Sequence, residues 1–175
     1  MSPASRLIFR KRRECLRASV AWLAALNFPL RADNSLTYLP PITLLASDGE
    51  QVLAASSRWR ATYIDFWASW CGPCKLSFPW MNHLHDTESV RGLRVVAINL
   101  DRREQDAHRF LQQNPARFAL AMDPEAQQAK RINIQAMPTS MLVASDKSIL
   151  FTHRGFRPDD GPDLERRIAA ALALR

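Results

Sequence analysis

The segment from Thr62 to Pro79 combines a strand pattern, a cysteine pair and a helix-forming stretch in one short run of sequence. Residues 62–67 are β-branched, aromatic or apolar apart from one aspartate, which is typical of a buried strand. This pattern breaks at Cys71-Gly72-Pro73-Cys74, and the residues that follow can form a helix. The chain is therefore expected to place two cysteines at the first turn of a helix, directly after a buried strand.

Two cysteines at the start of a helix form a chemically reactive pair. Backbone N–H groups and the positive end of the helix dipole favour the thiolate of Cys71, and Cys74 follows one helical turn later. We therefore expect dithiol–disulfide exchange, in which Cys71 attacks a substrate disulfide and Cys74 resolves the mixed disulfide. Gly72 would leave room for a second chain to approach the sulfur, and Pro73 suits a first helical turn. A zinc site is the alternative, but the sequence has no second Cys or Cys/His pair at ligand spacing.

The amino-terminal segment, residues 1–32, has the order of a signal peptide. A basic cluster at residues 10–13 precedes a mostly apolar run from Ala18 to Leu30, and Ala32 is a candidate cleavage position. The arginines of the basic cluster also resemble a twin-arginine signal, so either export route fits. An uncut membrane anchor and an amino-terminal helix that stays on the protein are the alternatives. We therefore predict a signal peptide over 1–32 and one domain over 33–175.

The charge and the cysteine count agree with this division. The chain carries a net charge of +7, but seven basic residues and one acidic residue fall within 1–32, so the remainder carries +1. A nearly neutral domain gives no electrostatic reason to expect nucleic acid as a partner. The third cysteine, Cys15, lies in the leader, and its removal would leave the Cys71 and Cys74 pair alone. A single closely spaced pair in an exported protein is more consistent with a redox couple than with a structural staple.

Strand and helix patterns alternate along the rest of the chain. This alternation, followed by a hairpin and a last helix, predicts an α/β fold with a central mixed β-sheet flanked by helices. A turn at Ser47-Asp48-Gly49 also suggests a short hairpin before the first long strand. The strands are expected at 62–67, 93–99, 118–122, 140–144 and 149–153, and the helices at 72–86, 104–113, 123–131, with Asp123 as N-cap and Pro124 first, and 163–174.

Asp65 is unusual because it lies in an otherwise apolar strand. Side chains alternate across a strand, so Asp65 shares a face with Trp67, whereas Ile64 and Phe66 share the other face. If the helix after the cysteines covers the Asp65 face, the carboxyl group is buried beneath the cysteine pair, and burial raises its pKa. Such a group could exchange a proton with Cys74 during turnover. The alternative is an aspartate at a strand end that binds backbone or water.

Met137-Pro138-Thr139 precedes the predicted strand at 140–144. Proline is compatible with a strand start, so Pro138 can be a simple strand cap. It can also form a cis peptide bond, which would turn the backbone of Met137 toward Cys71 for pairing with an extended substrate. The residues alone leave both possibilities open.

Three features together resemble the thioredoxin superfamily. The segment from Ile64 to Lys75, with Pro79 five residues after the second cysteine, is similar to a thioredoxin active-site segment, and Met137-Pro138-Thr139 is similar to the cis-proline loop. The long spacing between Cys74 and Pro138 accommodates an additional helix–strand unit. This insertion resembles the TlpA/ResA-like thiol:disulfide reductases of the bacterial cell envelope. The sequence departs from that group at Ala136, where glycine is common, and at residues 57–61, which lack the usual Gly-Lys.

The resemblance implies a thioredoxin-like fold and a role for each matching residue. Cys71 would be the attacking thiol, Cys74 the resolving thiol, Asp65 a buried acid and Pro138 the cis-proline. Trp70, Gly72, Pro73, Met137 and Pro138 would form the substrate-docking surface.

The resemblance also implies an enzyme that acts without a cofactor. The expected activity is that of an exported thiol:disulfide oxidoreductase that reduces protein disulfides, in cytochrome c maturation or copper-site assembly. It would be a periplasmic or envelope-bound monomer, reduced by a membrane thiol transporter. A thiol peroxidase of the same fold is one alternative, but Ala68 stands where that class needs a hydroxyl residue. A non-enzymatic copper carrier is the other alternative, although no Met/His cluster accompanies the cysteines.

Overall fold

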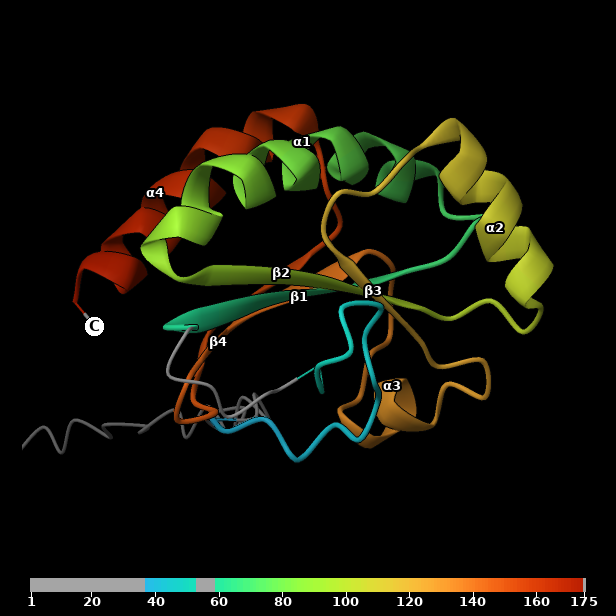
Figure 1. Ribbon diagram of the computed structural model, residues 1–175, viewed down its shortest axis with the longest axis horizontal. Helices are drawn as coiled ribbons and strands as arrows, with labels where there is room; N and C mark the ends of the chain where they lie inside the picture. Colours follow the sequence, from blue (N-terminus) through green and yellow to red (C-terminus); the bar gives the residue numbers. More distant parts are fainter. Residues whose placement is uncertain (1–36, 53–58, 175) are drawn as a thin grey trace, which may run out of the picture. The chain divides into compact units, whose positions relative to one another are not determined.

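A five-stranded mixed sheet forms the centre of the domain in the computed structural model, which describes residues 37–52 and 59–174 (Figure 1). The predicted leader at 1–32 and part of the segment at 57–61, which departs from the family pattern, lie outside these residues. The strand order is β3-β2-β1-β4-β5; β1, β2 and β3 are parallel, and β4 is antiparallel to both β1 and β5. The predicted mixed sheet is therefore confirmed. The strands are β1 (Ala61–Trp67), β2 (Leu93–Asn99), β3 (Ala119–Met122), β4 (Thr139–Ala144) and β5 (Ile149–Arg154).

Helices cover both faces of the sheet. Figure 1 shows α1, α2 and α4 on one face and α3 on the other. Along the chain, β3 and α3 follow α2 and precede the Met137-Pro138 loop. The sequence predicts an additional helix–strand unit in this interval. The helices are α1 (Gly72–Glu88), α2 (Glu104–Gln113), α3 (Gln127–Arg131) and α4 (Gly161–Ala173), with 3₁₀ turns at Ser89–Arg91 and Pro158–Asp160.

The central strand β1 is buried along its whole length and divides the core into two layers. Tyr63 and Trp67 pack with both cysteines and with apolar residues of α1, α2 and α4. Ile64 and Phe66 pack on the opposite side with the segment before β1 and with α3. This division matches the predicted alternation, because successive strand side chains point to opposite faces. Trp67 contacts the ring of Phe78 on α1 at a centroid distance of 4.8 Å.

The predicted start of α3 is wrong. Asp123 and Pro124 lie in a turn, and the helix begins only at Gln127, after Ala126 adopts a left-handed conformation with φ 51°. Asp123 nevertheless caps the helix, since its carboxylate accepts hydrogen bonds from the backbone N–H groups of residues 127, 128 and 129. These donors would otherwise have no intrahelical partner.

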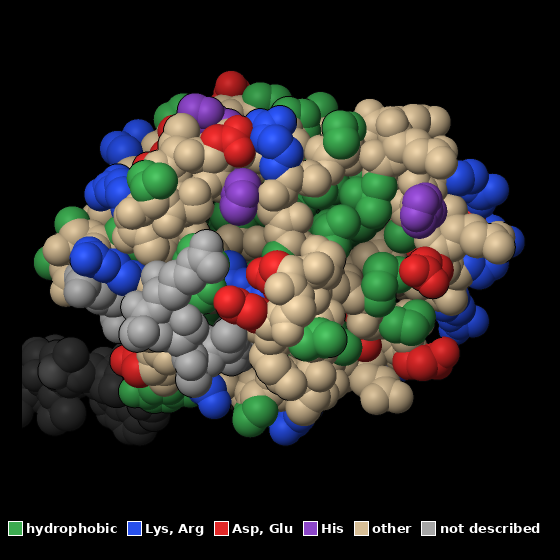
Figure 2. All heavy atoms as spheres, viewed as in Figure 1, with side chains coloured by type: hydrophobic (Ala, Val, Ile, Leu, Met, Phe, Trp, Pro, Cys, Tyr) green, Lys and Arg blue, Asp and Glu red, His purple; other side chains and the backbone are tan. Residues whose placement is uncertain are grey.

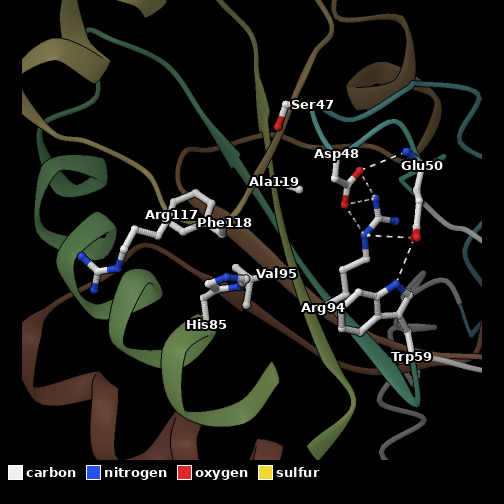
Figure 3. A pocket seen from close by; sticks show the side chains of 10 residues that line it. All are labelled: Ser47, Asp48, Glu50, Trp59, His85, Arg94, Val95, Arg117, Phe118 and Ala119. Atoms are coloured by element: carbon white, nitrogen blue, oxygen red, sulfur yellow. Dashed lines mark hydrogen bonds and ion pairs between the residues drawn. The ribbon is translucent and has the colours of Figure 1, made fainter. Parts of the chain in front are cut away.

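The predicted early hairpin is reduced to one antiparallel bridge, between Leu45 and Gln51. Gly49 turns the chain with φ 81°, as the sequence predicts. Arg94 of β2 holds this turn in place: its guanidinium donates to the carboxylate of Asp48 and to the backbone carbonyls of Gln51 and Val52. Arg94 and Asp48 line a hollow of about 380 Å³, as does His85 from α1. Figure 3 shows the side chains around it.

Replacing Arg94 with methionine is expected to lower the free energy of unfolding by about 2 kcal/mol. The Arg94 side chain is 2% exposed, whereas its partner Asp48 is 37% exposed and can be rehydrated, so the cost stays below that of a fully buried pair. Urea unfolding measures the change. Arg91→Met is the matched control, because the exposed Arg91–Glu88 pair should contribute less than about 0.5 kcal/mol. Equal effects of the two substitutions would contradict a stabilising role for the buried arginine.

Candidate active site

The cysteine pair lies at the beginning of α1, and three residues separate Cys71 from the end of β1. Cys71 is the N-cap residue of the helix, and its Sγ accepts a hydrogen bond from the backbone N–H of Cys74 at 3.3 Å. Pro73 occupies the first turn, where its missing N–H costs nothing. The two cysteines form a disulfide, with their Cα atoms 5.3 Å apart. The predicted placement of the pair at a helix start is confirmed.

The two cysteines differ in their surroundings. Cys74 is completely buried, whereas Cys71 is 4% exposed and is bordered by exposed residues on both sides. Trp70 is 71% exposed, and Gly72 and Pro73 are also exposed. A side chain added at Gly72 would meet no atom within 4 Å, so the backbone beside the sulfur is open. This arrangement suits an attacking role for Cys71 and a resolving role for Cys74.

The Met137–Pro138 peptide bond is cis, as the resemblance to the thioredoxin superfamily implies. Pro138 directly precedes β4, whose first residue, Thr139, lies opposite Phe66 near the end of β1. The antiparallel pairing thus brings the start of β4 to the end of the sheet from which the cysteine loop emerges. Met137 is half-buried and packs against the core cluster that contains both cysteines. The Pro138 carbonyl accepts a hydrogen bond from the Gly155 N–H at 2.7 Å.

Asp65 is 2% exposed, and its Oδ2 has no hydrogen-bond partner among the described residues. Burial raises the pKa of this carboxyl group well above its usual range. The predicted burial of Asp65 is therefore confirmed. Neighbouring Tyr63, on the same side of β1, has its pKa raised by burial and then by the Asp65 charge, and a hydrogen bond with Ser140 opposes the shift. The carboxyl group thus lies in the apolar layer that contains the cysteines.

Sequence reasoning missed a second buried carboxylate near the cysteines. Asp101 is 4% exposed and follows the end of β2, the strand parallel to β1. Its Oδ2 accepts from the Ser69 backbone N–H at 2.9 Å, and its Oδ1 accepts from the Ser69 hydroxyl at 3.0 Å. The available sequence signal was its position: the carboxyl ends of adjacent parallel strands lie side by side, so residues after β2 adjoin the loop after β1.

Other features of the described surface are less distinctive. Basic and acidic side chains are interspersed on the face that Figure 2 shows. Within residues 37–52 and 59–174, no group of three or more His, Cys, Asp or Glu side chains is arranged to hold a metal ion. None of the helices in this part of the chain has the length and hydropathy needed to cross a bilayer.

Comparisons with known proteins place these features in one family. Residues 34–170 match the Redoxin family, a range that includes the cysteine pair and the Met137–Pro138 loop. The chain is 23% identical to the thiol-disulfide oxidoreductase ResA of Bacillus thuringiensis subsp. konkukian, over 66% of this chain and 67% of that protein. It is 22% identical to ResA of Bacillus subtilis strain 168, over 63% and 62% of the two chains.

Solved structures give the same result. A protein assigned as the thiol:disulfide interchange protein DsbE of Chlorobium tepidum is 42% identical, with a TM-score of 0.72 over 77% of this chain and 95% of that chain. StoA of Bacillus subtilis is 23% identical, with a TM-score of 0.63 over 76% and 99% of the two chains, and shares the fold.

Proposed function

Because the chain belongs to the Redoxin family and is a TlpA/ResA-like thiol-disulfide oxidoreductase of the thioredoxin superfamily, we propose that its Cys71–Cys74 pair reduces disulfide bonds of exported proteins. The observation that carries this proposal is the disulfide at the N-cap of α1, in which Cys71 lies between exposed residues and Cys74 is completely buried. A disulfide that only stabilises the fold would not need two cysteines in different surroundings. Closing a loop this short also adds little chain-entropy stabilisation.

The reaction moves two electrons from the dithiol to the substrate. The Cys71 thiolate attacks one sulfur of a substrate disulfide, the substrate S–S bond breaks, and the leaving thiolate takes a proton from water. The product is a mixed disulfide with Cys71. Cys74 then loses its proton and attacks the Cys71 sulfur, which forms the Cys71–Cys74 disulfide and breaks the bond between Cys71 and the substrate. The second substrate sulfur leaves as a thiolate and takes a proton from water.

Asp65 is the group that accepts the Cys74 proton in this proposal. Two observations support it: the carboxyl group is buried without a partner for Oδ2, and its neighbours Tyr63 and Trp67 pack in the same cluster as Cys74. Burial of both groups keeps water from exchanging the proton freely, and the raised pKa of Asp65 makes its carboxylate a stronger base.

Substrate docking is assigned to the surface around Cys71. Trp70, Gly72 and Pro73 provide exposed apolar and open backbone area beside Cys71. Met137, which packs against the core cluster that contains the cysteines, and cis-Pro138 would provide the other side. An extended substrate segment would lie between them and pair with the backbone near Met137.

The exported location of the protein is part of the same proposal. Residues 1–32 have the order of a signal peptide, and the resemblance to the TlpA/ResA-like group implies a protein of the cell envelope. A membrane thiol transporter would return the pair to the dithiol form, and cytochrome c maturation or copper-site assembly would supply the substrates. Amino-terminal sequencing of protein purified from the envelope tests the cleaved leader: a start near Asp33 supports it, and a start at Met1 contradicts it.

Catalysed reduction of insulin by dithiothreitol tests the function itself. The wild-type protein is expected to accelerate the reaction, whereas the double variant Cys71→Ser/Cys74→Ser is expected to leave the uncatalysed rate. Circular dichroism shows whether the double variant is folded. A folded double variant that is as active as the wild type would overturn the proposed function.

A further inference from the structure

Hydrogen bonds fix the loop between β1 and α1 on both sides of the exposed Trp70. On the amino-terminal side, Ser69 gives two hydrogen bonds to the Asp101 carboxylate, one from its backbone N–H and one from its hydroxyl. On the carboxyl-terminal side, the Cys71 N–H donates to the Ala68 carbonyl at 3.1 Å. Trp70 lies between these anchors and is 71% exposed. Its ring is therefore presented to solvent by a backbone that has little freedom.

The Asp101 carboxylate is itself held in one orientation. The Asn99 side-chain amide donates to Asp101 Oδ2 at 2.8 Å, and the Asp101 N–H donates to Asn99 Oδ1 at 2.9 Å. Asn99 and Asp101 are both almost completely buried. The Leu100 N–H adds a bond to the Trp67 carbonyl at 2.9 Å, which joins the two chain segments just before the loop. The end of β2 is thus a rigid support for the cysteine loop.

We propose that Asp101 is a positioning residue that holds the Ser69–Trp70 backbone in the conformation that docks protein substrates. This role rests on the proposed function, because it concerns the encounter between the reductase and a protein disulfide. A loop fixed in its bound conformation loses less conformational entropy on docking, so a fixed loop binds more tightly than a mobile one. Asp101 acts through Ser69 and does not touch the reacting sulfurs.

The chemistry of the sulfurs is separable from this support. Among the described contacts of Cys71, its Sγ binds the Cys74 N–H within α1 and does not bind Asp101. A small disulfide that needs only the sulfur should therefore react normally when the loop is released. A polypeptide that must also contact Trp70 should not. Loss of Asp101 is therefore expected to weaken the reaction with polypeptide disulfides and to leave the reaction with small disulfides unchanged.

A second carboxylate in the same fold provides a matched control. Asp123 is 3% exposed, follows the end of β3 and accepts three backbone hydrogen bonds, but these come from α3 and not from the cysteine loop. Asp101→Ala and Asp123→Ala therefore remove equally buried carboxylates with three hydrogen bonds each. Only the first substitution releases Ser69.

The experiment compares both variants with the wild type in three measurements. For Asp101→Ala, the KM for insulin is expected to rise about tenfold while kcat changes less than about twofold. The rate of the reduced variant with 5,5′-dithiobis(2-nitrobenzoate) is expected to stay within about twofold of the wild type. Amide hydrogen exchange at residue 69 is expected to accelerate, because its backbone N–H loses its acceptor. Asp123→Ala is expected to leave all three quantities unchanged.

The outcomes separate the positioning role from the proposed function. Unchanged exchange at residue 69, an unchanged insulin KM, or an equal slowing with both disulfides would each overturn the role of Asp101. Faster exchange in a protein whose wild type does not reduce insulin would overturn the proposed function instead. If Asp101→Ala does not fold, Ser69→Ala removes only the hydroxyl bond; it should raise the insulin KM by a smaller factor, and an unchanged KM would again overturn the role.

Discussion

Replacing Cys71 with serine is expected to reduce insulin reduction to the uncatalysed rate, a loss of at least about a thousandfold. The hydroxyl of serine stays protonated at neutral pH and cannot attack a disulfide, and Cys74 cannot substitute for Cys71 because it is completely buried. The measurement is the initial rate of insulin reduction by dithiothreitol. Cys15→Ser in the full-length chain is the control and should retain full activity, because Cys15 lies in the predicted leader.

Cys74→Ser should fail at a different step. Cys71 can still attack, so the variant should accumulate a mixed disulfide with insulin, visible as a conjugate on a non-reducing gel or by mass spectrometry. Cys71→Ser should form no such conjugate. If Cys71→Ser accumulated the conjugate instead, the assignment of attacking and resolving thiols would be reversed.

Replacing Asp65 with asparagine is expected to slow turnover near pH 7 by about tenfold. Asparagine has nearly the same shape but cannot accept the Cys74 proton, which must then leave by a slower route. The deficit should shrink as the pH rises above about 8.5, where thiols ionise without a base. The kcat of both proteins from pH 6 to 10 tests this expectation. A constant ratio across that range would show that Asp65 has no part in proton transfer.

The same substitution is expected to stabilise the folded protein at neutral pH, by about 2 kcal/mol. In the unfolded chain the carboxyl group ionises near the ordinary aspartate pKa of 3.8, whereas burial raises the folded pKa well above that value. Between the two values the folded state binds more protons, so the stability of the wild type falls as the pH rises through this window. Below the unfolded pKa, the carboxyl group is protonated in both states and the advantage of asparagine disappears.

Asp123→Asn is the matched control for the stability prediction. Asp123 is as buried as Asp65, but its carboxylate accepts three backbone hydrogen bonds, and an amide nitrogen cannot accept any. This variant should therefore be less stable than the wild type at pH 7. Urea unfolding at pH 4 and pH 7 measures both variants. A destabilised Asp65→Asn protein at pH 7 would mean that the carboxyl group has a stabilising partner.

Local patterns in the sequence predict most of the fold. The bounds of β2 and α2 match the prediction to the residue, because an apolar run and a helical apolar face define them locally. The predicted start of α3 is wrong because Asp-Pro-Glu is a typical N-cap sequence, and only the tertiary structure shows that Asp123 reaches forward over a turn to cap a helix that begins at Gln127.

The parts of the candidate site that lie within one short sequence motif were predictable. The contacts that join residues from different strands were not. Cys71, Cys74 and cis-Pro138 lie where the sequence and its family resemblance place them. The contact of Asp101 with Ser69, 32 residues apart in the sequence, depends on the register of β1 and β2, which pairs Trp67 with Asn99. No local pattern encodes that register.

The pairing of the strands has a consequence for how this protein can be altered. The cysteine loop, Asp101 and the Met137–Pro138 turn all adjoin the end of the sheet where Trp67 pairs with Asn99, whereas Arg94 and its contacts lie near the opposite end, where Ala61 pairs with Leu93. Exposed residues at the end near Arg94 can therefore be changed, for example to attach a tag or a surface, at a distance from the cysteines, provided that Arg94 and its hydrogen bonds are kept. A redox sensor could be attached there without obstructing the substrate.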